Sequence, residues 1–132
     1  KTPKKPYSVT LAISDKLDTL SGFFSINLKP TSSKDPFALR RSAIGLIRLI
    51  IENKLEIKLK DIINYSFVLF SEQDMNFDIK LAQQELYSFI SDRLRFYMKE
   101  KNIRPDIIDC SMSSYNTDQI YKIFNKALIL NK

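Results

Sequence analysis

Histidine, tryptophan and paired cysteines are missing from this 132-residue chain, which has no His, no Trp and a single Cys at position 110. Without His there is no imidazole for acid–base catalysis, no His-activated nucleophile and almost no choice of zinc ligands. A single Cys excludes an intrachain disulfide. Most classes of hydrolytic enzyme are therefore excluded, and we expect no catalytic residue and no metal site in this chain.

Long hydrophobic runs are missing as well. No apolar stretch approaches the roughly 20 residues that a membrane-spanning helix needs. The first six residues contain three Lys and two Pro and lack the apolar segment of a signal peptide. We therefore expect a cytoplasmic protein with no membrane partner. Because the first residue is not Met, we also expect a segment of a longer protein.

Positive charge is in excess, with 21 Lys and Arg against 15 Asp and Glu. The balance is positive over residues 1–60 and 91–132 and negative over 61–90. A basic balance indicates either a nucleic-acid partner or a soluble surface. Lys outnumbers Arg 15 to 6 and Ile outnumbers Ala 17 to 5, which is typical of A/T-rich codon usage. We therefore give the Arg residues more weight than the Lys residues.

The spacing of apolar residues predicts helices, because such residues recur three and four positions apart in most of the chain. With 44% apolar residues the chain can bury a real core. We find no convincing pair of strands, although residues 66–70 would also suit a strand. The sequence therefore predicts an all-α bundle of about five to six helices. We expect these helices over about 8–24, 35–55, 59–70, 77–101, 105–113 and 117–130.

The second helix has the clearest start signal. Asp35 can accept hydrogen bonds from the free N–H groups of a first turn, and Pro36 fits that turn with its fixed φ. Small residues at positions 38, 42 and 45 form one stripe along this helix, which would allow a second helix to approach closely. Thr117 can cap the last helix in the same way as Asp35.

Five cations are candidate contacts for an RNA backbone, because guanidinium and ammonium groups pair with phosphate. Two of them have a simpler structural interpretation. Asp35 would occupy the helix N-terminus beside Lys34, and Arg48 lies four residues before Glu52 at ion-pair spacing. Arg95 points away from the apolar face of its helix and is the better exposed candidate. The full set is Lys34, Arg40, Arg41, Arg48 and Arg95.

Three other charged residues have structural interpretations. Arg93 falls within the apolar face of its helix, where an unpaired charge is costly, so we expect it to meet a carboxylate of Asp106 or Asp109. Asp15 and Asp18 share a helix face, which without His or a third ligand is more typical of a solvated surface than of a metal site.

Five tyrosines in the later part of the chain could stack on RNA bases. Because they recur at helical spacing, we expect them to be core residues instead. These are Tyr65, Tyr87, Tyr97, Tyr115 and Tyr121.

Four segments carry a resemblance to a known family. Residues 15–24 and 29–41 closely resemble a signature stretch in the beta subunit of bacterial heterotetrameric glycyl-tRNA synthetase, and the run Lys-Pro-Thr-Ser-Ser-Lys-Asp-Pro-Phe-Ala-Leu-Arg-Arg is its most specific part. Residues 92–97 and 103–109 are similar to the same subunit further along. The resemblance covers roughly residues 9 to 110.

The resemblance implies a fragment of an aminoacyl-tRNA synthetase. Residues 1–34 would be the end of an HD-like domain and a connecting loop, and residues 35–132 a helical body leading toward the anticodon-binding region. The implied partners are tRNA(Gly) and the alpha subunit, in a tetramer of two alpha and two beta subunits. In that family the alpha subunit forms glycyl-adenylate, so ATP would be used by the whole enzyme and no cofactor is expected in this fragment.

The resemblance also leaves two rival functions open. Asp15 takes the position of the final Asp in HD-type domains, so the chain would alternatively be the remnant of a metal phosphohydrolase. The His-containing elements of those domains lie upstream of the matched segment, so no phosphohydrolase activity is carried over. The other rival is a structural or protein-interaction module whose basic residues are simply solvated.

Overall fold

The computed structural model describes residues 5–26, 30–31, 33–35, 37–68, 79–114 and 119–131. Within these residues every regular element is an α-helix and none is a strand, so the predicted all-α class is confirmed. The elements are α1 (Pro6–Ser25), α2 (Leu39–Glu52), α3 (Leu59–Ser66), α5 (Ile79–Glu100), α6 (Pro105–Ser114) and α7 (Ile120–Leu130).

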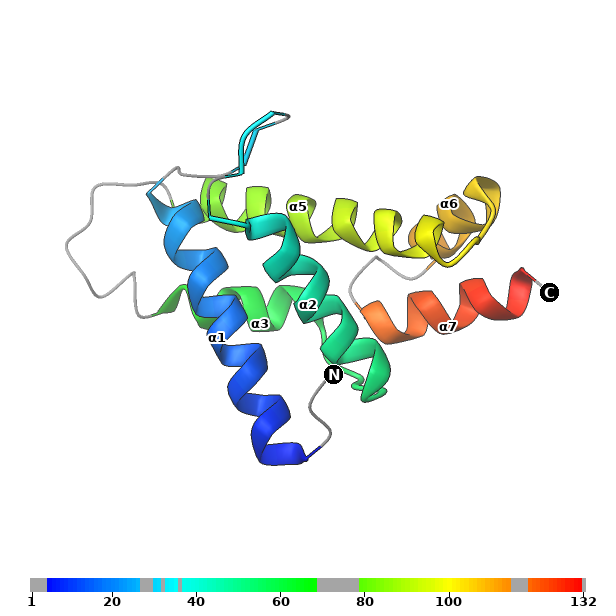
Figure 1. Ribbon diagram of the computed structural model, residues 1–132, viewed down its shortest axis with the longest axis horizontal. Coiled ribbons are helices and arrows are strands. Elements are labelled where there is room, and N and C mark those ends of the chain that lie inside the picture. Colours follow the sequence, from blue (N-terminus) through cyan, green and yellow to red (C-terminus); the bar gives the residue numbers. More distant parts are fainter. Residues whose placement is uncertain are drawn as a thin grey trace.

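The long helix α5 connects the two ends of the bundle (Figure 1). Toward one end it packs against α1, α2 and α3, and toward the other it meets α6. Helix α7 returns beneath α5 and packs against both α6 and α2. The molecule therefore has a four-helix part around α1 and α2 and a smaller end formed by α6 and α7.

One hydrophobic core joins both parts and draws side chains from all six helices. Leu20 of α1 and Leu86 of α5 are fully buried in it, as are Leu46 and Ile50 of α2. Burying one such side chain contributes about 1.5–3 kcal/mol. The predicted apolar faces of α1 and α5 are confirmed, because their stripes at three- and four-residue spacing are the residues that enter the core. The domain boundary expected at residue 34 stays a prediction, although α1 shares this core with the residues beyond it.

Helix α2 begins later than the sequence predicts. It starts at Leu39, not at Pro36, because Ala38 takes a left-handed backbone conformation with φ of 53°. The capping role of Asp35 is nevertheless confirmed. Its carboxylate accepts hydrogen bonds from the backbone N–H groups of Leu39 at 2.8 Å and Arg40 at 2.9 Å, across the intervening turn.

The turn between α5 and α6 is held by the end of α7. Asn102 takes a left-handed conformation with φ of 63°, which ends α5 and lets α6 begin at Pro105 as predicted. The side chain of Asn131 donates to the carbonyl of Asn102 at 3.3 Å and accepts from the backbone N–H of Arg104 at 3.2 Å. Gln119 is the N-cap residue of α7. Thr117, the predicted cap, lies outside the described residues.

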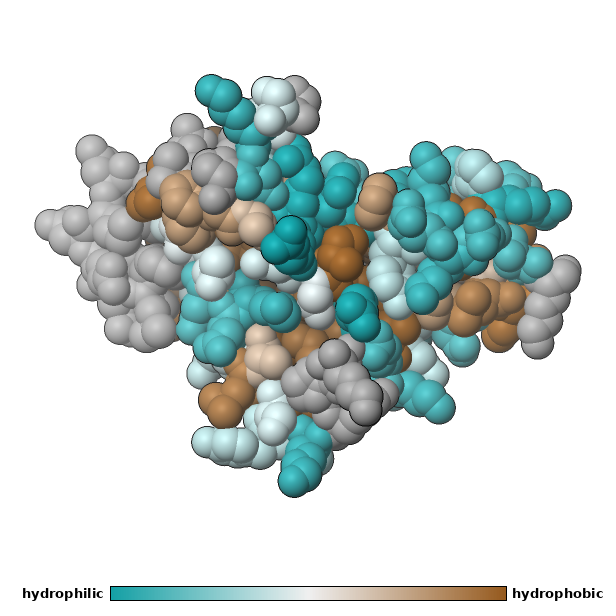
Figure 2. Space-filling view, in the orientation of Figure 1, coloured by the Kyte–Doolittle hydropathy of each residue, from teal (hydrophilic) through white to brown (hydrophobic). Residues whose placement is uncertain are grey.

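Apolar side chains interrupt the polar surface in a few places. Figure 2 shows one such patch over α7, where Leu128, Ile129 and Leu130 are between 41% and 60% exposed. No helix within the described ranges combines the length and the apolar character needed to cross a membrane.

Candidate nucleic-acid interface

Three of the five candidate cations are engaged with carboxylates. Arg48 Nε lies 3.0 Å from Glu52 Oε2, the surface ion pair that the spacing allowed. Arg95 donates to the carboxylate of Asp109 on α6. Arg40 Nη1 lies 3.9 Å from Asp35 Oδ2, and its other terminal nitrogen donates to the carbonyl of Thr31. Each guanidinium would have to exchange or share this partner to bind a phosphate.

The other two candidate cations are available to bind a phosphate. Arg41 and Lys34 are exposed, and their side chains have no ion-pair partner among the residues that the structure describes. The backbone N–H of Lys34 donates to the hydroxyl of Thr31 at 3.1 Å, which fixes the loop that carries it. The N-terminus of α2 is not an anion site, since Asp35 already accepts from its free N–H groups.

The predicted partner of Arg93 is wrong. Asp109 pairs with Arg95, and Asp106 lies 3.6 Å from Arg104, so neither expected carboxylate meets Arg93. The Arg93 guanidinium instead lies over the ring of Phe96, 5.0 Å from its centroid, and its Nε is buried without a hydrogen-bond acceptor in the described structure. Residues three apart on a helix are neighbours, so this local stack competes with any carboxylate on another helix.

Asp15 and Asp18 lie on the exposed face of α1, as the sequence predicts. Within the described ranges, no group of three or more His, Cys, Asp or Glu side chains could hold a metal ion. The carboxylate pair therefore gains no third ligand from the fold, and nothing in the described residues supports the phosphohydrolase interpretation.

The tyrosines divide between the core and the surface. Tyr97 is buried, and burial raises the pKa of its hydroxyl above 10.0, with nearby Glu52 raising it further and Arg48 opposing. Tyr87 and Tyr121 are half-buried against the core. Tyr65 is an exception to the core prediction, because 81% of it is exposed. Tyr115 lies outside the described residues.

Sequence reasoning missed a polar cleft of about 550 Å³ between α3 and α5. Lys60 and Asn64 line it from α3, and Lys80, Gln83 and Tyr87 line it from α5. Gln84 and Ser88 extend the same wall, and none of the described residues that line the cleft is a carboxylate. The Lys60 ammonium lies over the Tyr87 ring, 5.5 Å from its centroid. The cleft thus combines two cations with amide and hydroxyl groups, which is the chemistry that recognises phosphate and sugar.

The only sequence signal for this cleft was a polar stripe on α5. Gln83, Gln84, Tyr87 and Ser88 recur at helical spacing beside the apolar stripe, with amides and hydroxyls where a surface helix commonly has Lys and Glu. Lys60 lies twenty positions before Lys80 in the sequence, and only the packing of α3 against α5 brings the two into one cleft.

Comparisons with known proteins find the same family that the signature stretch at residues 15–24 and 29–41 resembles. A family model described as glycyl-tRNA synthetase beta subunit matches residues 1–113. The glycine–tRNA ligase beta subunit of Cereibacter sphaeroides is 40% identical over 129 residues, covering 98% of this chain and 18% of the relative. The beta subunits of Dinoroseobacter shibae and Clostridioides difficile are 36% and 35% identical, again over 98% of this chain. The chain spans about a fifth of the length of these relatives. It belongs to the glycyl-tRNA synthetase beta subunit family.

Proposed function

We propose that this chain contributes tRNA binding to a glycine–tRNA ligase and has no catalytic group of its own. The observation that carries the proposal is the cleft between α3 and α5, where two lysines, three side-chain amides and a tyrosine converge. None of the described residues that line this cleft is a carboxylate. Membership of the family supplies the substrate class, and the net charge of +6 favours an anionic partner.

The proposed mechanism is positional. Lys60 and Lys80 bind phosphates from opposite walls of the cleft, and the amides of Asn64 and Gln83 hydrogen-bond to sugar or base edges. Arg41 and Lys34 add charge elsewhere on the surface. The rigid core then fixes the tRNA relative to the alpha subunit, which would carry out the ATP-dependent activation of glycine.

The test is the salt dependence of tRNA(Gly) binding by this chain, measured by filter binding. Affinity should fall steeply with salt, because phosphate contacts release counterions. Lys60→Ala and Lys80→Ala should each lower the slope of log affinity against log salt by about 1. Lys99→Ala is the matched control, an exposed lysine on α5 outside the cleft. Undetectable binding at low salt, or binding that salt does not weaken, would exclude phosphate contacts by this chain.

One observation favours the structural alternative. Arg40, Arg48 and Arg95 are all paired with carboxylates, as expected of a surface that has no anionic ligand. In that case Arg41→Glu would change neither tRNA affinity nor assembly with the alpha subunit. Under the tRNA proposal the same substitution weakens tRNA binding and leaves assembly intact, so the two measurements separate the alternatives.

A further inference from the structure

A second and larger cavity of the molecule is apolar and lies between α1 and α3. It is an open groove of about 840 Å³. Val9, Ile13 and Leu17 line it from α1, and Ile62 and Tyr65 line it from α3. None of the residues of the candidate RNA cleft belongs to it.

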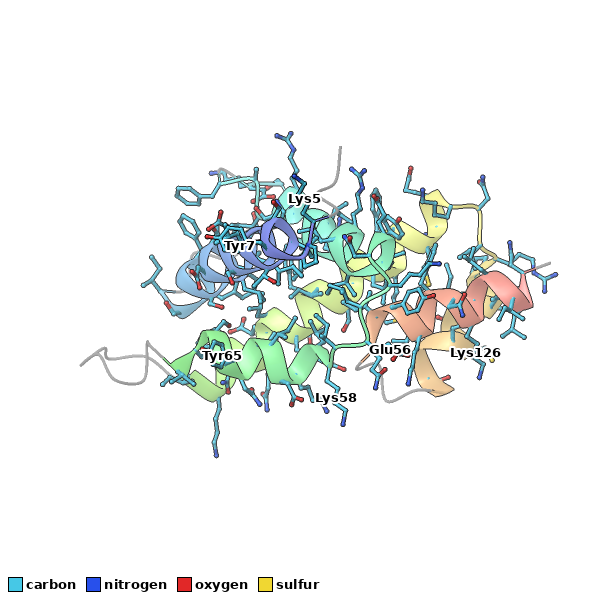
Figure 3. All side chains as sticks on the ribbon, turned by 90° about the horizontal axis from the view of Figure 1, so that it is seen from below. Lys5, Tyr7, Glu56, Lys58, Tyr65 and Lys126 are labelled. Carbon is cyan, nitrogen blue, oxygen red and sulfur yellow. The ribbon has the colours of Figure 1, made fainter. Side chains whose placement is uncertain are left out.

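Apolar side chains remain in water along this groove. Tyr65 is 81% exposed, and Val68, which follows α3, is 48% exposed. Figure 3 shows Tyr65 on α3, on the side where this helix runs beside α1. A concave apolar surface with an exposed aromatic ring is typical of a binding site.

Three of the polar side chains that line the groove are already hydrogen-bonded within the chain. The Thr10 hydroxyl donates to the carbonyl of Pro6 at 3.0 Å, and the Asn53 amide donates to the carbonyl of Leu49 at 2.9 Å. The Ser66 hydroxyl donates to the carbonyl of Ile63 at 2.7 Å. Each of these three groups already donates a hydrogen bond within the chain, so few hydrogen-bond donors remain in the groove for a polar small molecule.

The shape of the groove fits a helix. On α1 its apolar lining recurs every four residues from Val9 to Leu17, and the small side chains of Thr10 and Ser14 lie beside that stripe. Two helices that present such stripes form a trough in which the apolar face of a third helix packs. The stripe spans about two and a half turns, so the matching helix needs roughly nine residues.

Two carboxylates define the charge of that helix. Asp18 of α1 and Asp61 of α3 both line the groove, and neither has an ion-pair partner in the described part of the chain. An occupant with Lys or Arg beside its apolar stripe would pair with them. An occupant helix that is strongly acidic would be repelled by the same two carboxylates.

We propose that the groove is filled by an amphipathic helix of the same subunit, from the part of the polypeptide that precedes residue 5. The curated relatives are about five times longer than this chain, so most of the subunit lies outside it. Pro6, the first residue of α1, itself lines the groove. The start of α1 therefore lies at the groove, so a segment joined there has a high effective concentration beside it. The proposal rests on family membership and not on tRNA binding.

The test uses the complete beta subunit with the photo-cross-linking residue p-benzoylphenylalanine at position 65 or 96. Phe96 is the matched control, an exposed aromatic on α5 that does not line the groove. Irradiation should join position 65 to a peptide before residue 5 of the same polypeptide, and position 96 should give no such product. The proposal is overturned if position 65 joins only to the alpha subunit or to a second beta subunit, or gives no product above the control.

Thermal unfolding of the complete subunit gives an independent measurement. Tyr65→Glu should lower the Tm by several degrees, because it places a charge against the packed helix. Tyr65→Phe, which keeps the ring, should leave the Tm unchanged. Equal Tm values for the two variants would overturn the proposal. Because Tyr65 is outside the RNA cleft, tRNA affinity should be unaffected, and a failure here is distinct from a failure of the tRNA proposal.

Discussion

Lys16 of α1 lies across Gly45 of α2, so that a Cβ atom added at position 45 would come within 2.8 Å of Lys16 Cε. Gly45 belongs to the stripe of small residues that the sequence shows along α2. The space above it is filled by the aliphatic stem of a lysine, which is the flexible end of a side chain and not a helix backbone. The close approach of α1 and α2 therefore leaves room for adjustment at this point.

Gly45→Ala should stabilise the chain by about 0.5–1 kcal/mol. Alanine favours the helical backbone over glycine by about that amount, and the Lys16 stem can move aside at little cost. Urea unfolding of both proteins measures the difference. In a Lys16→Ala background the gain should be at least as large, since nothing then opposes the new methyl group. A net loss in the single variant would show that Lys16 is held in place.

Asp35→Ala should destabilise the chain by about 0.5–2 kcal/mol, the usual cost of losing a helix cap. The carboxylate accepts from two backbone N–H groups of α2, and alanine leaves both without this acceptor. Asp35→Asn is the matched control, because the amide oxygen can still accept one of these bonds and should recover part of the loss. Equal losses in the two variants would assign the effect to the charge beside Arg40 instead of the cap.

Much of this fold could be predicted because the helices follow the apolar periodicity. The residue at which each helix starts was harder to predict. The left-handed conformation of Ala38 delays α2 by three residues, and no periodic pattern encodes a single backbone angle. The last helix shows the same limit, since α7 begins at Ile120 and its predicted start was 117.

The candidate site was predicted less well, because ion pairing depends on how helices rotate against one another. Arg93 and Arg95 are two positions apart, so they point to different sides of α5, and it is Arg95 that faces Asp109 of α6. The pairing of the two walls of the cleft, α3 and α5, depends on tertiary packing. Lys60 and Lys80 have no pattern in common that would place them together.

Arg41→Ala should weaken tRNA(Gly) binding and lower the salt slope by about 1, because Arg41 is an exposed guanidinium with no ion-pair partner in the described structure. The double variant Arg48→Ala/Glu52→Ala removes a 3.0 Å ion pair and leaves the net charge unchanged, so it should bind like the unmodified chain. Lys99→Ala has the same net charge as Arg41→Ala and controls for long-range electrostatics. If Arg41→Ala and Lys99→Ala weaken binding equally, Arg41 makes no direct contact.

Tyr97 should make the stability of the chain depend on alkaline pH. Burial raises the pKa of its hydroxyl above 10.0 in the fold, Glu52 adds to the rise and Arg48 opposes it, while Lys101 lies over the ring, 5.3 Å from its centroid. A raised pKa means that the folded chain holds the phenolic proton more tightly than the unfolded chain. The resulting stability is fully present below pH 10 and is lost as the pH rises through the folded-state pKa.

Tyr97→Phe has no proton to lose at this position, so its stability should fall less steeply above pH 10. Between the unfolded and folded pKa values, the unmodified chain should lose about 1.4 kcal/mol per pH unit relative to the variant. Urea unfolding at intervals from pH 8 to 11 measures both curves, and every other ionisable group is common to the two proteins. Parallel curves for Tyr97→Phe would show that the buried hydroxyl is solvated well enough to ionise in the fold.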